Sequence, residues 1–564
     1  MTLGTPVRRL GRKRRHTVHL LMWSAILPAA ACSSSPAGPA LLPCSAALAS
    51  HQVALAVAAD TTIDPAADSG CVTFAANLSA VDSVEYLLVP QSAATTFGQS
   101  SPFLLRTTTV TAPAPVAQGM VATSSPRLTA LQFDGFLRHL ARSRAFAAAP
   151  AGRAVTAPGI VTATPPTVGS LRTFRVCPNL NCSVPFQAVV ARAKTVGAHI
   201  AIYVDTLAPK AGLDSADLDT LKQVFDSRLY PLDTTTFGGV SDIDANSVVI
   251  VLMTGVVNKL VSKATCKSSG FVAGFFFPTD LDITAPTSFS NHGEVFYSIV
   301  ADSTGTLSCQ HTRDEVKLVL PGTFTHEFQH MINYVQHVLA RPGQPEEGWL
   351  DEGLSKYAEE LAGRSYLPGD TVTFSNYAID DVFDAYQYLS ATGTSPLLIE
   401  LDQGTLAEVG ASWLFVRYLV DQYGATLPGK LDQTTLSGAA NVVAQTGHAF
   451  DTTLTRWALA NWVSDLPGFI APPELTYTSW HFRKTYASLH TQDSTDFPLP
   501  YPLVPARSPG SAVNLRGTLF SGSGVYQRAL QAPSAPAYTV QLRSSATALF
   551  PVGLGAQLDV IRIH

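Results

Sequence analysis

Charged side chains are scarce in this sequence of 564 residues. Asp, Glu, Lys and Arg make up 14% of it, and the formal net charge is −5 at pH 7. No basic excess of the kind that binds nucleic acid is present, so we expect no nucleic-acid partner. The sequence also lacks an uncharged apolar run of about 18 residues, the length of a transmembrane helix, and it lacks an internal repeat. A globular chain of roughly three domains is the expectation.

The dense basic run in the sequence stands near its start. Residues 8–15 are rich in Arg and Lys and precede a short apolar stretch and the small residues 29–31, which together are the three parts of an export signal. Small residues directly before Cys32 resemble a bacterial lipoprotein signal, in which the cysteine is acylated. We therefore predict a signal peptide over 1–31 and lipidation of Cys32. Plain secretion is the alternative, because Ala29 stands where that pattern prefers Leu.

Seven cysteines agree with export into an oxidising compartment. Acylation of Cys32 would leave six, an even number that suits three disulfides. Order along the chain suggests the pairs Cys44–Cys71, Cys177–Cys182 and Cys266–Cys309. Other pairings, and buried free thiols, remain alternatives. None of the cysteines lies in the close cluster that a Cys-based zinc site needs.

The pattern of strands and helices predicts an α+β protein of several domains. Short β-type runs over 32–125 indicate a β-sandwich-like domain. Over 126–168 an amphipathic helix precedes an Ala/Pro-rich linker, and both a prosegment and a plain spacer fit this part. Mixed strand and helix patterns indicate a central domain over 169–490. Strands between Pro, Gly and Ser turns indicate a C-terminal β-rich domain over 491–564.

The most informative motif is THEFQHMI at 325–332. His326 and His330 lie one helical turn apart on one face, so both imidazoles can bind one metal ion. Glu327 projects beside that face, where it can accept a proton from water whose pKa zinc has lowered, and can pass it to a leaving amine. A chance HExxH would face solvent. The neighbours here are apolar, as in a buried helix: Phe324, Phe328, Met331 and Ile332.

A catalytic zinc usually takes a third protein ligand. The phrase WLDEGLS at 349–355 closely resembles the Trp-Leu-Asn-Glu-Gly-Phe-Ala phrase of gluzincins, in which the glutamate is that ligand. The resemblance implies this role for Glu352. Glu359, two turns further on the same face, is either an acceptor that orients a ligand histidine or a solvated charge beside Glu360. We interpret three neighbouring carboxylates as exposed groups at a helix start: Glu346, Glu347 and Asp351.

Several phrases together resemble the hyicolysin-type zinc metallopeptidases of the gluzincin group. They are HEFQHMIN at 326–333, WLDEGLSKY at 349–357, FGGVSDIDAN at 237–246, SN at 290–291 followed by EVFY at 294–297, and GASWLFVRYL at 410–419. The resemblance covers about 170–465. It implies a gluzincin-like catalytic domain within 169–490, flanked by β-rich domains. It also implies a bacterial endopeptidase with one catalytic Zn²⁺ that acts on proteins or peptides. The absence of a Gly-x-Met-Glu-Asn phrase favours internal cleavage over N-terminal trimming.

Two further site predictions have weaker support. Asp242, Asp244 and Asn246 alternate as ligands do in calcium loops, but the Gly and the distal Glu of an EF-hand are missing, so we favour a turn over a Ca²⁺ site. The reaction also needs a donor that stabilises the transition state. Four downstream tyrosines are candidates: Tyr357, Tyr377, Tyr386 and Tyr388.

Two other classes of protein fit parts of the pattern. One is a catalytically weak surface binding protein on a peptidase scaffold. The other is a structural lipoprotein with a chance HExxH, which would bind no metal. In every case we expect an extracytoplasmic location, at the cell surface or outer membrane through a lipid anchor, or as a secreted protein. Contact with a membrane would be made through that anchor alone.

Overall fold

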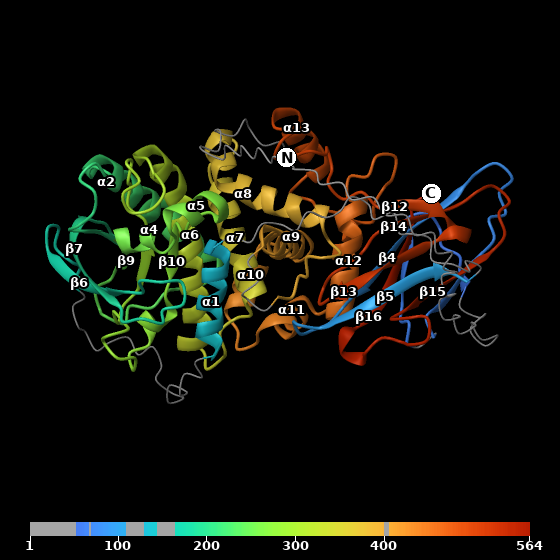
Figure 1. Cartoon of the computed structure of the whole chain (residues 1–564), viewed down its shortest axis with the longest axis horizontal. Helices are drawn as coiled ribbons and strands as arrows, with labels where there is room; N and C mark the ends of the chain where they lie inside the picture. The colour runs from blue at the N-terminus through green and yellow to red at the C-terminus, as the bar shows by residue number, and fades with distance from the viewer. Residues whose placement is uncertain (1–51, 67–68, 109–128, 144–163, 400–404) are drawn as a thin grey trace, which may run out of the picture.

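The computed structural model describes residues 52–66, 69–108, 129–143, 164–399 and 405–564 (Figure 1). The predicted α+β class is confirmed, since two five-stranded sheets, one six-stranded sheet and many helices make up this part of the chain. Figure 1 shows the six-stranded sheet at one end, helices in the middle and the two other sheets at the opposite end. The predicted signal peptide over 1–31, Cys32 and Cys44 lie outside the described residues.

The two five-stranded sheets pack face to face as a β-sandwich. In order across the first sheet, the strands are β1 (Gln52–Val53), β3 (Cys71–Phe74), β15 (Tyr538–Arg543), β5 (Ser100–Thr107) and β13 (Asn514–Phe520). Across the second they are β12 (Ala506–Pro509), β14 (Gln527–Gln531), β4 (Val84–Ser92), β16 (Ala556–Arg562) and β2 (Asp60–Ile63). Side chains of both sheets share one core, in which the rings of Phe74 and Tyr86 lie 4.9 Å apart.

This sandwich corrects the prediction of two separate β-rich domains. β4 pairs with β14 and β16, and β5 pairs with β13 and β15, so segments from 32–125 and 491–564 alternate within the same sheets. The alternation of apolar residues identified the strands, but strand periodicity does not show which strands pair. The strands of each segment therefore complete the sheets of the other.

The six-stranded sheet has three parallel strands in the centre and antiparallel pairings toward both edges. Its order is β10 (Gly274–Phe276), β11 (Val295–Ser298), β9 (Val249–Met253), β8 (Ile200–Asp205), β7 (Gln187–Val196) and β6 (Leu171–Val176). β8, β9 and β11 run parallel, whereas β10 is antiparallel to β11. Every residue of β9 (VIVLM) is buried, as expected for a central strand covered on both faces.

Helices cover this sheet and fill the space between it and the sandwich. They are α1 (Thr129–Ser143), α2 (Ser215–Val224), α3 (Tyr230–Thr236), α4 (Gly255–Lys259), α5 (Lys263–Ser269), α6 (Arg313–Tyr334), α7 (Gly348–Arg364), α8 (Thr371–Ser390), α9 (Leu406–Tyr423), α10 (Leu427–Asp432), α11 (Gly438–Thr446), α12 (Phe450–Val463) and α13 (Phe482–Gln492). Shorter π and 3-10 turns occupy Phe225–Leu229, Val335–Leu339, Pro278–Leu281, Pro473–Leu475, Gly510–Ala512 and Val552–Leu554. Within the described ranges, no helix is both long and apolar enough to cross a membrane.

Helix α6 carries the HExxH motif and begins at a capping box. The hydroxyl of Thr312 accepts the N–H of Glu315 at 3.2 Å, and the carboxylate of Glu315 accepts the N–H of Thr312 at 2.7 Å. Further along, the ring of Phe324 packs edge-on against Phe296 of β11 at 5.2 Å. These contacts fix where the helix starts and which side of it lies on the sheet.

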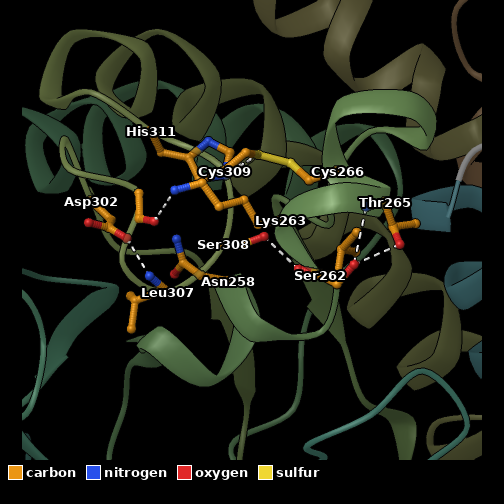
Figure 2. Close-up of a disulfide and its surroundings, with 12 residues drawn as sticks. Asn258, Ser262, Lys263, Thr265, Cys266, Asp302, Leu307, Ser308, Cys309 and His311 are labelled. Carbon is orange, nitrogen blue, oxygen red and sulfur yellow. Dashed lines mark hydrogen bonds between the residues drawn. A yellow bond between two sulfur atoms is a disulfide. The ribbon is translucent and has the colours of Figure 1, made fainter.

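A disulfide between Cys266 and Cys309 joins α5 to the loop that leads into α6 (Figure 2). In the same region, Lys263 donates a hydrogen bond to the carbonyl of Gly305 at 2.9 Å. Cys177 and Cys182 are also bonded, so two of the three predicted pairs are present. The third pair involves Cys44, which is not among the described residues. Two disulfides are compatible with a protein that works outside the cytoplasm.

Candidate metal centre

Two histidines on α6 face each other at hydrogen-bond distance. The Nε2 atoms of His326 and His330 are 3.1 Å apart, and the two rings are nearly perpendicular, at an interplanar angle of 83°. A spacing of four residues brings them to one side of the helix, as the motif predicts. Phe328, two residues after His326, packs edge-on against Phe225 on another side of the helix, which holds the histidine side in place.

Glu352 on α7 joins this pair. Its Oε1 lies 3.3 Å from Nε2 of His330, and its Oε2 lies 3.7 Å from Nε2 of His326. One ligand atom of each of the three residues therefore lies within 4.8 Å of the others. The next residue, Gly353, lets α7 approach α9 closely, because a Cβ there would lie 2.7 Å from the carbonyl oxygen of Ser412. The glycine of the WLDEG phrase thus has a packing role that helps to present Glu352.

These three side chains fit a tetrahedral zinc ion. Two nitrogen ligands of one zinc, each at about 2.0–2.1 Å, are roughly 3.3 Å apart, and the two Nε2 atoms are separated by 3.1 Å. Oε1 of Glu352 is buried and has no hydrogen-bond donor among the described residues. A buried carboxylate oxygen without a partner is costly, and a cation would remove that cost. Two imidazoles and one carboxylate are also a donor set that catalytic zinc takes.

The ring nitrogens on the far side of both histidines have acceptors of their own. His326 Nδ1 lies 2.8 Å from Oε1 of Glu359, and His330 Nδ1 lies 2.9 Å from Oγ of Ser355. Ser355 donates its own proton to Gln329, so its oxygen accepts from His330. We infer that both rings carry their proton on Nδ1 and turn the lone pair of Nε2 toward the gap, as metal-binding histidines do. Glu359 makes the contact that its interpretation as an orienting acceptor requires.

Asp351 is a buried neighbour of the histidine pair, and its predicted exposure is wrong. It is 5% exposed, and its Oδ1 lies 3.0 Å from Nδ1 of His330. Glu346 is also buried, where it accepts hydrogen bonds from the backbone of Gly438 and the side chain of Asn441. A helix-start position explains why a carboxylate is tolerated there. It does not reveal that this end of α7 faces the protein interior.

Glu327 lies beside the ligand cluster and is anchored to the edge of the six-stranded sheet. Its Oε2 accepts a hydrogen bond from the backbone N–H of Phe276, the last residue of β10, at 2.8 Å. The side chain also belongs to a second group of ligand atoms within 4.8 Å that includes His330. One oxygen is therefore held by the sheet, and the carboxylate lies next to the candidate ligand atoms, where a general base would stand.

The charges around the histidines favour a cation. Burial and the Arg138 guanidinium lower the pKa of His330, but Asp351 and Glu352 outweigh them, and the pKa is raised well above its usual value. Burial raises the pKa of Glu352. A hydrogen bond shared with Asp134 and the nearby His330 lower the pKa by more than burial raises it, so it lies well below its usual value. An excess of carboxylates that stabilises a proton on His330 would also stabilise a divalent ion.

Helix α1 brings two charged residues to the cluster that the sequence analysis missed. Asp134 Oδ1 lies 3.9 Å from Nε2 of His330, and its carboxylate is grouped within 4.8 Å with ligand atoms of Glu327 and His330. Arg138, 4% exposed, lies 3.3 Å from Asp134 and 3.4 Å from Asp351. The sequence pattern predicted this helix, but the spacing of its apolar residues does not show which part of the protein the helix packs against. The available signal was a pair of opposite charges, Asp134 and Arg138, four residues apart and each directly after an apolar residue of the helix.

The four candidate tyrosines separate into two pairs. Tyr386 exchanges hydrogen bonds with backbone groups of the segment after α13, and Tyr388 stacks on Trp457. Both are thus engaged within the helical core. The two earlier candidates, Tyr357 and Tyr377, are buried on α7 and α8. The role of either one as the donor that stabilises the transition state stays a prediction.

The group of Asp242, Asp244 and Glu294 contains ligand atoms within 4.8 Å of one another. Asp242 accepts the backbone N–H of Asn246 at 2.9 Å, which makes the turn that the sequence favours. Asp244 lies 3.2 Å from the guanidinium of Arg172. Because a cation of the chain already pairs with this group, its support for Ca²⁺ stays weak.

Comparisons with known proteins return no match, either to a protein-family model or to a curated protein. The likeness to hyicolysin-type peptidases accordingly depends on the sequence phrases quoted above. The case for a metal centre depends on the geometry of α1, α6, α7 and β10.

Proposed function

We propose that this chain is a zinc-dependent endopeptidase of the hyicolysin type, within the gluzincin group. His326, His330 and Glu352 would hold one catalytic Zn²⁺. The observation that carries the proposal is the convergence of three ligand atoms, one of them an unpartnered buried oxygen, beside a carboxylate. When bound, zinc supplies a Lewis acid that polarises a peptide carbonyl and lowers the pKa of water.

Glu327 has the position of the proton carrier. The N–H of Phe276 holds Oε2, which leaves Oε1 to take a proton from the attacking water and to deliver it to the leaving amine. Glu359 and Ser355 hold the Nδ1 protons of His326 and His330, so the rings cannot turn away from the metal position.

An extended peptide is the substrate that the neighbouring sheet edge suits best. β10 is the edge strand of the six-stranded sheet, and the backbone N–H and C=O of Phe276 contact Glu327 and Arg138 instead of another strand. An extended polypeptide binds such an edge through main-chain hydrogen bonds, for which the C=O of Phe276 is available once Arg138 is displaced, while its N–H stays with Glu327. This mode holds a substrate on both sides of the scissile bond, which supports internal cleavage of proteins or peptides.

The location we propose is extracytoplasmic. The signal-like start of the sequence and two disulfides support export, with lipidation at Cys32 or secretion as the two routes.

The rival candidate is a catalytically weak binding protein on the same scaffold. It gains support from one observation, which is that α1 fills the cleft between β10 and the start of α7, beside the ligand cluster.

Metal analysis combined with a hydrolysis assay tests this function. The purified parent chain should carry one Zn²⁺, which His330→Ala should lose and Glu327→Gln should keep. Casein hydrolysis should be at least about 100-fold slower with Glu327→Gln, by the usual scale of general-base loss. The comparison is repeated with Asp134→Ala added to both chains, because Asp134 lies in the cleft. A parent chain without zinc, or equal rates with and without the Glu327 carboxylate, would contradict the proposal.

A further inference from the structure

Helix α1 is packed into the cleft through its apolar side. Phe133, Leu137 and Ala141 are buried, and Phe133 packs edge-on against Phe275 of β10 at 5.1 Å. Figure 1 shows α1 in cyan, between the six-stranded sheet and the helices around α7. The helix is therefore seated against the same strand edge that we assign to substrate.

A second side of α1 makes polar contacts with the site. Arg138 donates to the carbonyl of Phe276 at 3.3 Å and to Asp351 at 3.4 Å. One turn further, Arg142 donates to the carbonyl of Pro345, just before α7, at 2.6 Å. These bonds connect α1 to both walls of the cleft, β10 on one side and the start of α7 on the other.

Asp134 points to the metal position itself. Its Oδ1 is 3.9 Å from Nε2 of His330, and its carboxylate lies within 4.8 Å of ligand atoms of His330 and Glu327. A carboxylate at the open position of a three-ligand zinc site would complete a tetrahedral set. A cavity of about 10 Å³ lies between Arg138, His330 and Asp351, with room for roughly one water molecule.

We propose that α1 is a built-in inhibitor, in which Asp134 takes the fourth position on the metal and Arg138 covers the edge of β10. The proposal rests on the peptidase function given above and names the regulation of that same site. Substrate then gains access when α1 leaves the cleft.

The sandwich limits how α1 can leave. The segments on either side of it lead to β5 and to β6, and β4 and β5 each pair with strands from the C-terminal part on both sides. Loss of everything before β6 would remove inner strands from both sheets of the sandwich. Activation by displacement of α1, or by a cut both within 109–128 and within 144–163, keeps the sandwich whole. Of the two interpretations of 126–168, a prosegment and a plain spacer, an inhibitory α1 favours the prosegment.

Asp134→Ala tests the proposal, and His139→Ala on the exposed side of the same helix is the matched control. Each full-length chain is loaded with Co²⁺, and its visible absorption reports the ligands around the ion. Asp134→Ala should change this spectrum, whereas His139→Ala should reproduce that of the parent. Amide hydrogen exchange in α1, measured without metal, should be unchanged by His139→Ala. Casein hydrolysis by the zinc-loaded Asp134→Ala chain should be at least about tenfold faster than by the parent, because a tethered ligand competes at roughly millimolar effective concentration.

The outcomes separate this proposal from the proposed function. Equal Co²⁺ spectra of parent and Asp134→Ala would overturn the inhibitory contact, as would a slower Asp134→Ala enzyme, which would place Asp134 in the catalytic machinery. Zinc binding with equal hydrolysis rates would leave the peptidase standing and remove the inhibition. A changed spectrum without hydrolysis by either chain would leave the contact standing and remove the peptidase. If Asp134→Ala does not fold, Asp134→Asn, which keeps the side-chain shape, takes its place under the same criteria.

Discussion

Removal of the Glu359 carboxylate should weaken zinc binding by about 10- to 100-fold. His326 Nδ1 lies 2.8 Å from Glu359 Oε1, and the glutamate side chain is 13% exposed, so solvent screens this bond little. A hydrogen bond to a charged group contributes about 1.5–3 kcal/mol, and each 1.4 kcal/mol corresponds to about a factor of ten. Lys356, 3.3 Å from Glu359, also lies 3.4 Å from Asp381, so Glu359→Ala does not strand a buried cation.

Competition with a chromogenic chelator at neutral pH measures this effect. Glu359→Ala should lose the full factor, and Glu359→Gln should lose about tenfold, because an amide oxygen still accepts the Nδ1 proton but carries no charge. Glu474→Gln, in the turn Pro473–Leu475, is the control and should bind zinc as the parent does. Equal zinc affinity of parent and Glu359→Ala would refute the view that Glu359 orients a metal ligand.

Two further predictions concern stability. Gly353→Ala places a Cβ 2.7 Å from the carbonyl of Ser412 and should lower the free energy of unfolding by about 1–3 kcal/mol; Gly239→Ala, which meets no atom within 4 Å, is the control, and equal melting temperatures of Gly353→Ala and parent would contradict the packing argument. Burial raises the pKa of Asp559 from 3.8 to about 7, against hydrogen bonds from Thr455 and others that lower it. Because the pKa of Asp559 is higher in the folded chain than in the unfolded chain, the contribution of Asp559 to the free energy of unfolding is complete below pH 3.8 and is lost as the pH rises to about 7. Asp559→Asn should therefore make the free energy of urea unfolding depend less on pH across that window. An unchanged pH slope would count against it.

The proposed metal ligands on α6 were within reach of the sequence because helical geometry determines how they lie relative to one another. His326 and His330 share a face through their spacing alone, and Glu327 follows from the same turn. Glu352 came from a resemblance between short phrases. Its proximity to the histidines depends on how α7 packs against its neighbours, and Gly353 shows that α7 needs a glycine where it meets α9.

The residues that were missed act through contacts between distant segments. Asp134 and Arg138 reach the site from a helix that is separated from α6 by about 170 residues of sequence and whose apolar pattern fits any core. Asp351 was predicted to be exposed because a negative charge near a helix N-terminus is favourable at a solvent-exposed end, and this rule does not show which helix ends are buried.

Strand pairing in the sandwich was missed for a related reason. The alternation of side chains identifies strands such as β4 and β16, but the partner of a strand is chosen by shape and burial across the whole chain. The order of the cysteines along the chain correctly predicted the local pair Cys177–Cys182. It also predicted Cys266–Cys309, whose two members lie on either side of the segment that contains β10 and β11.

Anomalous diffraction at the zinc absorption edge, from crystals of the parent chain, shows directly whether α6 and α7 hold a zinc ion between them. We expect one strong peak within bonding distance of His326 Nε2, His330 Nε2 and the Glu352 carboxylate. The absence of a peak at this point, or a zinc ion bound by other residues instead, would contradict this expectation.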